Sequence, residues 1–468
     1  MTHTVEKIGG TSMTRFAEIL QNVIIGHRSS AELYNRIFIV SAYGGVTNLL
    51  LENKKNGAPG VYGKFAKDDE SWQDALETVR AEMIRLNRSF QNLGLDQDAA
   101  DKFVNERLDG IRDCLLDLQK LRKYGQFNMG SYLLPTREML AAVGEAHSAH
   151  NSVLILKKHG INAVFIDLTG WMKKESMSFE KAVRHGFEGI DISISLPIVT
   201  GYVKYDEGIM TRFDRGYSEI TFSKVAVVTR AREGIIHKEY HLCTADPKII
   251  GEDKVKVIGH TTFDIADQLS DLDMEAIHSK AAKEMEHLKI PIRVKKAFDP
   301  DNPGTLISRD YISPTPHVEM ICGRKDVEAI EVMDPEMVGK VGYDYHLMKT
   351  MFDTRISYIA KTTNANTITV FVPQKNPRLE ECIELIRGLF PSAQVRTFGT
   401  AIVSVIGTNM SIPGFLSRAA NALHSANINV LALVQSTRQV NMQFIVERED
   451  FEKAQQALHK AFVEDLQK

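Results

Sequence analysis

Short apolar runs alternate with longer stretches of helical spacing through the first two thirds of the chain. The apolar runs Thr4–Ile8 and Arg36–Ala42, for example, are separated by an amphipathic stretch. This order predicts helices layered on a mostly parallel sheet, because consecutive parallel strands need a crossover between them. The predicted fold class is therefore α/β. Further strands are expected at Ala163–Leu168, Ile198–Tyr205, Ile235–Leu242 and Ile292–Phe298.

The α/β region also contains longer stretches with helical spacing. The glycine-rich segment Gly57–Gly63 breaks the alternation, and a polar stretch with helical spacing follows over about Glu70–Lys123. We interpret residues 64–125 as an inserted helical pair. Helical spacing returns at Tyr132–Lys158 and at Met274–Leu288.

The last third of the chain repeats itself. Ile356–Ala360 is echoed by Ile428–Ala432, at an offset of 428 minus 356, or 72 residues. A helical stretch precedes each copy, at Met337–Phe352 and at Pro413–Ala426. Each unit is predicted as strand, helix, two strands, helix and strand, which is typical of a small ferredoxin-like α+β module. Two such modules without catalytic clusters suit ligand sensing or subunit contact.

A chain of 468 residues is too long for one ordinary core. The turn-rich segment Asp299–Gly304 should close the α/β region. We therefore expect a catalytic domain over residues 1–312, followed by small modules at 313–395 and 396–468.

The composition is that of a soluble globular protein, with 43% hydrophobic residues and a formal net charge of -3. This balance gives no reason to expect nucleic acid or a membrane surface as partner. The apolar runs are far shorter than the roughly 20 residues that span a bilayer, and the N-terminus lacks signal-peptide order. Cytoplasm is the expected compartment. The four cysteines lack ligand spacing and receive no role: Cys114, Cys243, Cys322 and Cys382.

Two glycine pairs follow the first two predicted strands, in Lys7–Ser12 and in Ser41–Asn48. Glycines at such a strand end let backbone N–H groups approach an anion, and a neighbouring lysine can neutralise a phosphate. One such pair alone is more often an ordinary strand-to-helix turn with a solvated lysine. Two pairs at neighbouring strands favour a nucleotide or phosphate site. Lys7 precedes its glycines, so this is not a Walker A loop.

A third candidate lies in Thr211–Thr221, where Arg215 could clamp a carboxylate and Glu219 could meet an ammonium. The alternative is a surface charge cluster at a helix start. Glu145 lies within a helix and is uninformative by itself. His147 and His150 have no third ligand at zinc spacing, so no metal site is expected.

These segments together resemble the aspartate kinase family, nearly end to end. KIGGTS at Lys7–Ser12 is similar to the family's K-F-G-G-T-S, and Val40–Asn48 is similar to its V-S-A-x-x-G-V-T-N. The C-terminal repeat is similar to the family's pair of ACT domains. Shorter matches follow in order: Gly144–Glu145 (S-x-G-E), Thr200–Tyr202 (T-G-F), Arg215–Glu219 (R-G-G-S-D), Thr244–Pro247 (T-A-D-P) and Pro303–Thr305 (P-G-T).

The resemblance implies the amino-acid-kinase fold, a three-layer αβα sandwich, followed by two ACT domains. It implies transfer of the γ-phosphoryl of ATP, with Mg²⁺, to the side-chain carboxylate of L-aspartate. The implied catalytic residues are Lys7, Arg215 and Glu219. The implied substrate contacts are Ser41, Thr47, Glu145, Arg215 and Ser218. The implied ATP contacts are Lys7, Gly9, Gly10, Thr11, Ser12, Thr244 and Asp246.

Several positions depart from the family pattern. Tyr217 replaces a glycine, Glu219 is one methylene longer than the usual acid, and Ala142 replaces a serine. The usual T-D-V-D-G run reads HKEYH at His237–His241, so ATP geometry is the least secure part of the resemblance. With M-E-A-I-H at Met274–His278, these features resemble the specialised aspartate kinases that accompany ectoine synthesis.

Two alternatives stay open at this point: a catalytically weak or dead amino-acid-binding regulator, and a different amino-acid kinase. The ACT pair predicts a homo-oligomer and an amino-acid effector near Ile356, Ile428 and Asn441. The predicted strand Ile356–Lys361 offers no carboxylate for an effector's ammonium group. We therefore expect inhibition by threonine, or no strong inhibition at all, ahead of inhibition by lysine, and at most partial feedback.

Overall fold

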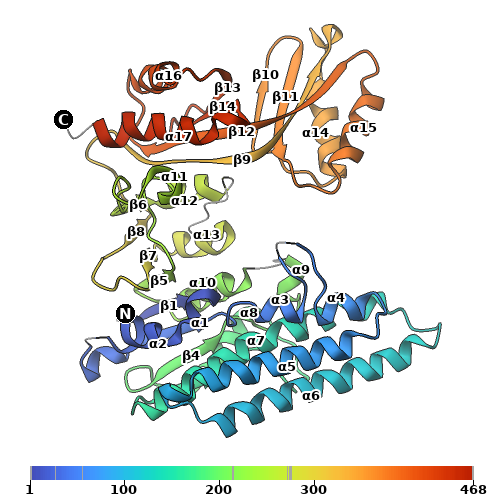
Figure 1. The fold of residues 1–468 in the computed structure, drawn as a ribbon, viewed down its shortest axis with the longest axis vertical. Coiled ribbons are helices and arrows are strands. Elements are labelled where there is room, and N and C mark those ends of the chain that lie inside the picture. Colours follow the sequence, from blue (N-terminus) through green and yellow to red (C-terminus); the bar gives the residue numbers. More distant parts are fainter. Residues whose placement is uncertain are drawn as a thin grey trace. The chain divides into compact units, whose positions relative to one another are not determined.

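The computed structural model describes residues 3–26, 28–54, 56–212, 216–270, 272 and 277–465. Two compact units make up the chain (Figure 1). The first comprises Met1–His241 with Ile277–Arg309, and the second comprises Leu242–Ala276 with Asp310–Lys468. The domain boundaries drawn from the sequence stay predictions.

The first unit is built on a mostly parallel sheet with the strand order β3-β4-β2-β1-β5-β7-β8. Each neighbouring pair is parallel except β7 and β8, which are antiparallel. The strands are β1 (Thr4–Ile8), β2 (Arg36–Val40), β3 (Ala163–Ile166), β4 (Leu196–Thr200), β5 (Glu233–Lys238), β7 (Ile292–Lys296) and β8 (Thr305–Ser308).

Helices cover this sheet as the alternation predicted. β1, β2 and β4 are buried along their whole length, which requires cover on both faces. The helix α7 (Gly130–Lys158) packs on β2, β3 and β4, and α10 (Tyr217–Val228) packs on β1, β2 and β5. The other helices are α1 (Gly10–Thr14), α2 (Phe16–Ile19), α3 (Val46–Leu50), α4 (Val61–Ala66), α8 (Phe179–Gly186), α9 (Ile209–Arg212) and α13 (Ser279–His287).

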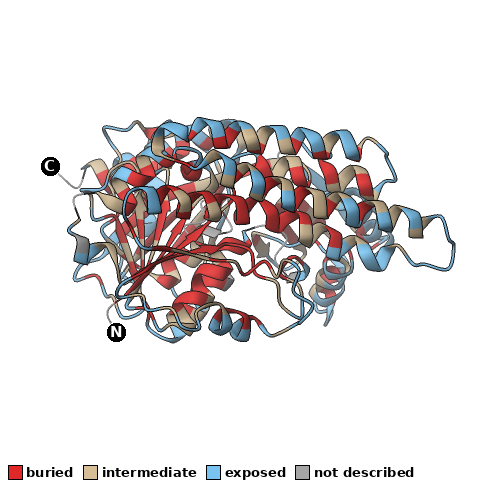
Figure 2. Ribbon diagram, turned by 90° about the horizontal axis from the view of Figure 1, so that it is seen from below, coloured by how far each residue is buried: buried red, intermediate tan, exposed pale blue. Residues whose placement is uncertain are grey.

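The inserted helical pair is present as α5 (Trp72–Ser89) and α6 (Gln97–Arg122). These helices pack on each other, and α6 packs on α7. Figure 2 shows their inner sides buried and their outer sides exposed, as expected for amphipathic helices. Residues 274–276 of the predicted helix at Met274–Leu288 lie outside the described residues. Ile277 and His278 precede the helix, which begins later than predicted, as α13 at Ser279.

The second unit contains one antiparallel sheet in the order β10-β11-β9-β12-β14-β13. Its strands are β9 (His317–Met333), β10 (Ala360–Thr363), β11 (Thr367–Pro373), β12 (Gln394–Thr408), β13 (Val430–Gln435) and β14 (Asn441–Glu447). Its helices are α14 (Tyr343–Asp353), α15 (Leu379–Leu389), α16 (Phe415–Ser425) and α17 (Phe451–His459). The segment from mid-chain adds α11 (Pro247–Ile250), β6 (His260–Thr262) and α12 (Phe263–Ser270).

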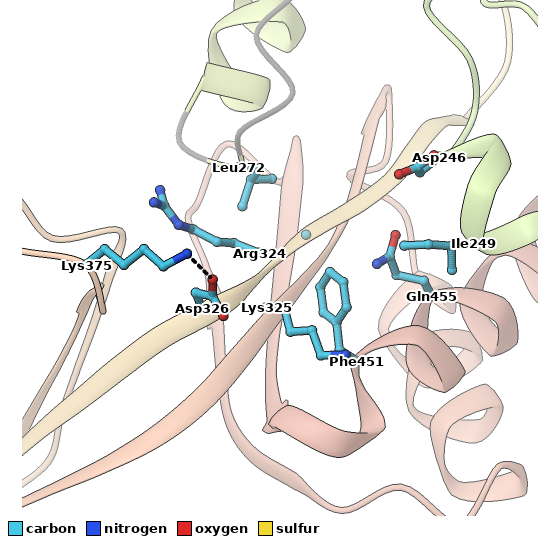
Figure 3. Close-up of a pocket in the computed structure, with 10 residues that line it drawn as sticks. Asp246, Ile249, Leu272, Arg324, Lys325, Asp326, Lys375, Phe451 and Gln455 are labelled. Atoms are coloured by element: carbon cyan, nitrogen blue, oxygen red, sulfur yellow. Dashed lines mark ion pairs between the residues drawn. The ribbon is translucent and has the colours of Figure 1, made fainter. Parts of the chain in front are cut away.

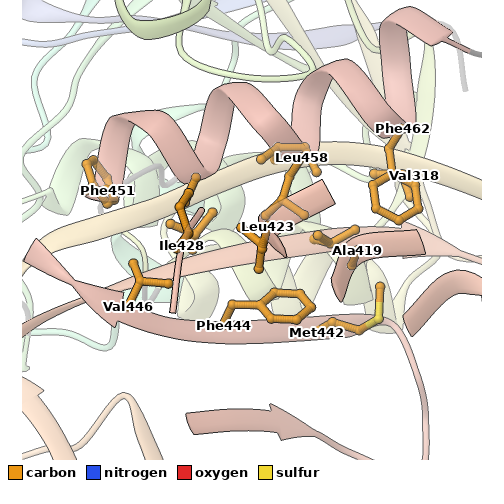
Figure 4. Close-up of a cluster of buried hydrophobic side chains, with 14 of the residues drawn as sticks. Val318, Ala419, Leu423, Ile428, Met442, Phe444, Val446, Phe451, Leu458 and Phe462 are labelled. Carbon is orange, nitrogen blue, oxygen red and sulfur yellow. The ribbon is translucent and has the colours of Figure 1, made fainter. Parts of the chain in front are cut away.

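Two separate cores stabilise the two ACT-like modules of this sheet. One core contains Leu347 and Val370, and the other contains Leu423 and Phe444 (Figure 4). The modules do not follow each other strictly along the chain, since Val318, from the first half of β9, packs in the second core. β9 is long enough to serve both modules because it has 17 residues.

None of the described helices combines the length and the apolar character that a bilayer crossing requires.

Candidate active site

The candidate site lies at one edge of the first unit's sheet. Lys7 stands near the end of β1, Ser41 directly follows β2, and Gly201 directly follows β4. These three strands are parallel neighbours, so their carboxyl ends meet at the same edge.

The two glycine loops meet at this edge. A Cβ added to Gly10 would come within 2.6 Å of the carbonyl oxygen of Ala42, so only glycine permits this approach. The Gly44 amide donates to Thr14 Oγ1 at 2.8 Å. Gly45 has a φ of 90° and caps the start of α3. The loops that the sequence predicted as neighbours are therefore in contact.

Lys7 and Glu219 form an ion pair at the carboxyl ends of these strands, and Lys7 Nζ lies 3.4 Å from Glu219 Oε1. The other oxygen, Oε2, accepts from the His278 amide at 2.7 Å. Burial alone would raise the pKa of Glu219, but the charges of Lys7 and Lys238 and the His278 amide outweigh it and lower that pKa. Glu219 is therefore held ionised beside the lysine.

Glu145 approaches the same cluster from α7 and is 3% exposed. Burial raises its pKa well above the usual value, and Ser218 and Lys7 oppose this rise only in part. Its Oε2 has no hydrogen-bond partner within the described part of the chain. A Cβ on Gly201 would come within 2.9 Å of this carboxylate, so the glycine leaves room for it. The site therefore holds a buried carboxyl group that a cation could stabilise.

Two serine hydroxyls complete the cluster. Ser41 Oγ and Ser218 Oγ are 3.0 Å apart, which joins the end of β2 to the first turn of α10. Ser148 Oγ donates to the Ser41 carbonyl oxygen at 2.8 Å and so fixes the loop to α7. Of the predicted residues, the structure brings together Lys7, Ser41, Glu145, Ser218 and Glu219.

The remaining predicted residues of the first unit lie around this cluster or outside the described residues. Ser12 is buried and donates to Glu239 Oε1 at 2.9 Å. Thr11 is exposed, and Thr47 is half-buried in α3. Arg215 lies outside the described residues.

Sequence reasoning missed Glu239 and His278. Both stand in segments that depart from the family pattern, so motif matching assigned them no role. A topological argument could have found Glu239, since it directly follows β5 and β5 pairs with β1. The His278 amide could not be found from sequence, because its contact with Glu219 spans 59 residues.

The predicted ATP contacts Thr244 and Asp246 belong to the second unit. Thr244 Oγ1 lies 3.0 Å from His459 Nε2. Asp246 caps α11 by accepting from the Lys248 amide at 2.9 Å. Asp246 also lines a cavity of about 360 Å³ with Phe451 (Figure 3). Both side chains thus hold local structure within this unit, and their contact with ATP stays a prediction.

The residues predicted near an effector lie in different surroundings. Ile356 packs in the core of the first module and Ile428 in that of the second. Asn441 Nδ2 donates to Gln268 Oε1 at 3.3 Å. The two isoleucines are thus core residues, and an effector role for any of the three stays a prediction.

The described residues include no group of three or more histidine, cysteine, aspartate or glutamate side chains arranged to hold a metal ion. His147 is fully buried and bonds Asn87 Oδ1 at 2.7 Å. Burial lowers the pKa of His147 to about 3, which is typical of a neutral core histidine.

Comparison with known proteins decides the family. Residues 3–296 match the amino acid kinase family, and residues 403–462 match an ACT domain. The aspartate kinase Ask_Ect of Stutzerimonas stutzeri is 48% identical over 464 residues, which are 99% of this chain and 98% of that protein. This chain belongs to the aspartate kinase family. The predicted family, fold class and enzyme class are therefore confirmed.

More distant aspartate kinases are similar to this chain over nearly its whole length. The chloroplastic aspartokinase 1 of Arabidopsis thaliana is 24% identical over 98% of this chain and 80% of that protein. E. coli aspartokinase III in complex with lysine and aspartate superposes with a TM-score of 0.72 at 18% identity, over 99% of this chain and 100% of that one. Its complex with aspartate and ADP gives 0.68 at 18% identity, over 98% and 99%.

Proposed function

We propose that this chain transfers the γ-phosphoryl group of MgATP to the side-chain carboxylate of L-aspartate, giving ADP and 4-phospho-L-aspartate. The observation that carries this proposal is the Lys7–Glu219 pair, 3.4 Å apart, beside buried Glu145 at the meeting point of two glycine loops. A carboxylate with a usual pKa near 4 is already ionised at neutral pH, so the nucleophile needs no general base. Catalysis then consists of positioning and charge stabilisation.

The Lys7 ammonium would stabilise the transferring phosphoryl group. In the structure its charge is balanced by Glu219, and the phosphate oxygens of ATP would supply a second anion. Backbone N–H groups of the Gly9–Gly10 turn would bind phosphate oxygens, because the first turn of a helix leaves its amides without intrahelical partners.

The amino-acid end of the substrate would meet the acidic side of the cluster. An α-ammonium placed between Glu145 and Glu219 would supply a hydrogen-bond donor to Glu145 Oε2 and a second cation beside Lys7. Arg215 would hold the α-carboxylate, and Ser41, Ser218 and Thr47 would orient the side-chain carboxylate.

Mg²⁺ would enter as part of the MgATP substrate. This ion prefers phosphate oxygens together with one or two carboxylates. Glu239 fits that preference, since its Oε1 lies 2.9 Å from Ser12 Oγ beside the glycine turn. The carboxylate would then bind the ion while Lys7 acts on the phosphoryl group.

Release of ADP in the presence of aspartate, glutamate or carbamate tests this function against the other amino-acid kinases. Only aspartate should support turnover. Equal turnover with glutamate would contradict the proposal, and so would a folded protein that binds aspartate without releasing ADP.

We propose further that the chain serves the branch of aspartate kinases associated with ectoine synthesis, and that the second unit joins subunits and binds an effector. The M-E-A-I-H segment and the relative named Ask_Ect support the branch. Added threonine should inhibit more than added lysine. Strong inhibition by lysine alone would contradict the effector proposal.

A further inference from the structure

Two tyrosines that stand where the family pattern has other residues lie against each other. Tyr202 occupies the phenylalanine position of T-G-F, and Tyr217 occupies the second glycine position of R-G-G-S-D. Their ring centroids are 5.7 Å apart with an interplanar angle of 80°, an edge-to-face contact. Both side chains are buried. The two tyrosines that depart from the family pattern are therefore in contact with each other. Neither position alone suggests this contact.

The hydroxyl group of Tyr202 has a specific partner in Glu138 of α7. Tyr202 Oη donates to Glu138 Oε2 at 2.7 Å. Burial and the Glu138 carboxylate both raise the pKa of Tyr202 above its usual value, so this hydroxyl keeps its proton and remains a donor. A phenylalanine would fill the same space without this bond.

The second oxygen of Glu138 holds the first turn of α9. Glu138 Oε1 accepts from the Met210 amide at 2.9 Å. Gly208 has a φ of 72°, and a Cβ there would come within 2.6 Å of the same oxygen. The turn before α9 is therefore shaped around this carboxylate.

These contacts lie on both sides of the segment that carries Arg215. Met210 belongs to α9, which precedes that segment, and Tyr217 is the first residue of α10, which follows it. Ser218 and Glu219, which line the candidate site, come next in the chain. The Glu138 carboxylate thus contacts Met210, which precedes the segment, and the Tyr202 ring contacts Tyr217, which follows it.

We propose that Glu138 and Tyr202 are positioning residues for the amino-acid substrate, and this rests on the proposed function. They hold Met210 and Tyr217, so that the start of α10, with Ser218 and Glu219, is fixed in place before aspartate binds. Such preorganisation lowers the cost of binding the amino acid and leaves ATP binding unchanged.

The test is the Tyr202→Phe variant of the full chain, which removes only the hydroxyl group. The KM for aspartate should rise about tenfold, the loss expected for one hydrogen bond to a charged group. The KM for ATP should change little, and the melting temperature should fall only by an amount similar to that in the Tyr343→Phe control. Glu138→Gln should give a similar rise, and the double variant should be little worse than either single variant, because both act through the same bond.

A matched control is Tyr343→Phe. Tyr343 Oη donates to Asp334 Oδ2 at 2.9 Å in the second unit, so the same kind of bond is removed there. This variant should leave both KM values unchanged. Unchanged KM for aspartate in Tyr202→Phe, or an equal rise for ATP, would overturn the proposal.

Amide hydrogen exchange separates this proposal from the proposed function. Exchange in the peptide that covers Ile209–Arg212 should be faster in Glu138→Ala than in the parent chain, whatever reaction the protein catalyses. Unchanged exchange there would refute the positioning role even in an active enzyme. A parent chain that fails to release ADP with aspartate would instead refute the proposed function.

Discussion

Lys7 is the residue on which the proposed chemistry depends most. Lys7→Ala should lower kcat about 100-fold or more, which is the usual loss when a group that stabilises developing charge is removed. Steady-state kinetics and circular dichroism of the folded variant check this.

Lys224→Ala offers a matched control, since Lys224 also pairs with a glutamate, Glu284, in the same unit but near the surface. Its kcat should stay near that of the parent chain. A folded Lys7→Ala protein with near-normal kcat would remove Lys7 from the mechanism.

The buried Glu145 carboxyl group should lower the free energy of unfolding at neutral pH. Its pKa in the folded state is raised well above the ordinary 4.5, so the folded chain keeps a proton that the unfolded chain releases. Stability therefore falls as pH rises from 4.5 through the raised pKa. Glu145→Gln should increase the melting temperature at pH 8, and the difference should vanish at or below pH 4. A lower melting temperature than the parent at pH 8 would contradict this account.

Residue chemistry at the strand ends could be predicted from the sequence. Lys7 and Ser41 were named from motifs and lie close together, because β1 and β2 are adjacent parallel strands whose carboxyl ends lie side by side. Glu219, also named from a motif, reaches Lys7 from the first turn of α10. Glu239 and His278 were missed because their segments depart from the pattern. The Glu138–Tyr202 bond was missed because it joins positions 64 residues apart.

At the scale of elements, the junction of β4, α7 and α10 depends on Gly201. A Cβ there would lie 2.6 Å from Ser218 Cβ and 2.9 Å from the Glu145 carboxylate. Gly201→Ala should cost about 1–3 kcal/mol of stability, which is typical of overpacking, and should raise the KM for aspartate. Denaturant unfolding and kinetics measure the two effects.

Gly125→Ala provides the comparison, since a Cβ there meets nothing within 4 Å. That variant should match the parent chain in both assays. If Gly201→Ala also matches the parent chain in stability and in the KM for aspartate, the close packing at this junction affects neither folding nor substrate binding.

The positions of the strands along the chain were predicted better than the pairing of strands within the sheets. The apolar runs at β1, β2 and β3 begin where the pattern placed them. The sharing of β9 between two modules could not be predicted, because its first half pairs with the distant end of β12, joining Ile321 to Val405. Local periodicity contains no information about such pairings.

At the scale of the whole molecule, exposed leucines on β13 of the second unit are candidates for the proposed subunit contact. β13 ends the sheet order, and Leu431 and Leu433 on this strand are 37% and 38% exposed. Exposed leucines on an edge strand are typical of a subunit contact. Leu433→Asp should lower the molar mass found by light scattering to that of a smaller assembly.

Leu385→Asp is the control, because Leu385 is 50% exposed on α15 rather than on an edge strand. Its mass should equal that of the parent chain. If Leu433→Asp also leaves the mass unchanged, subunits do not associate through β13.

The membership of Leu242–Ala276 in the second unit was outside the reach of sequence reasoning. The Ile321 amide donates to the Thr244 carbonyl oxygen at 2.8 Å, and Thr244 also contacts His459. These partners lie 77 and 215 positions away along the chain. Motif order placed the segment in the predicted catalytic domain, and that boundary stays a prediction; the contacts of Thr244 join the segment to β9 and α17.

The most direct measurement for the central claim is trapping of the acyl phosphate with hydroxylamine. The parent chain, supplied with MgATP and L-aspartate, should form the hydroxamate at the side-chain carboxyl group, and Lys7→Ala should form about 100-fold less per unit time. Formation of no hydroxamate while ATP and aspartate are present, or equal formation by the Lys7→Ala variant, would contradict the account.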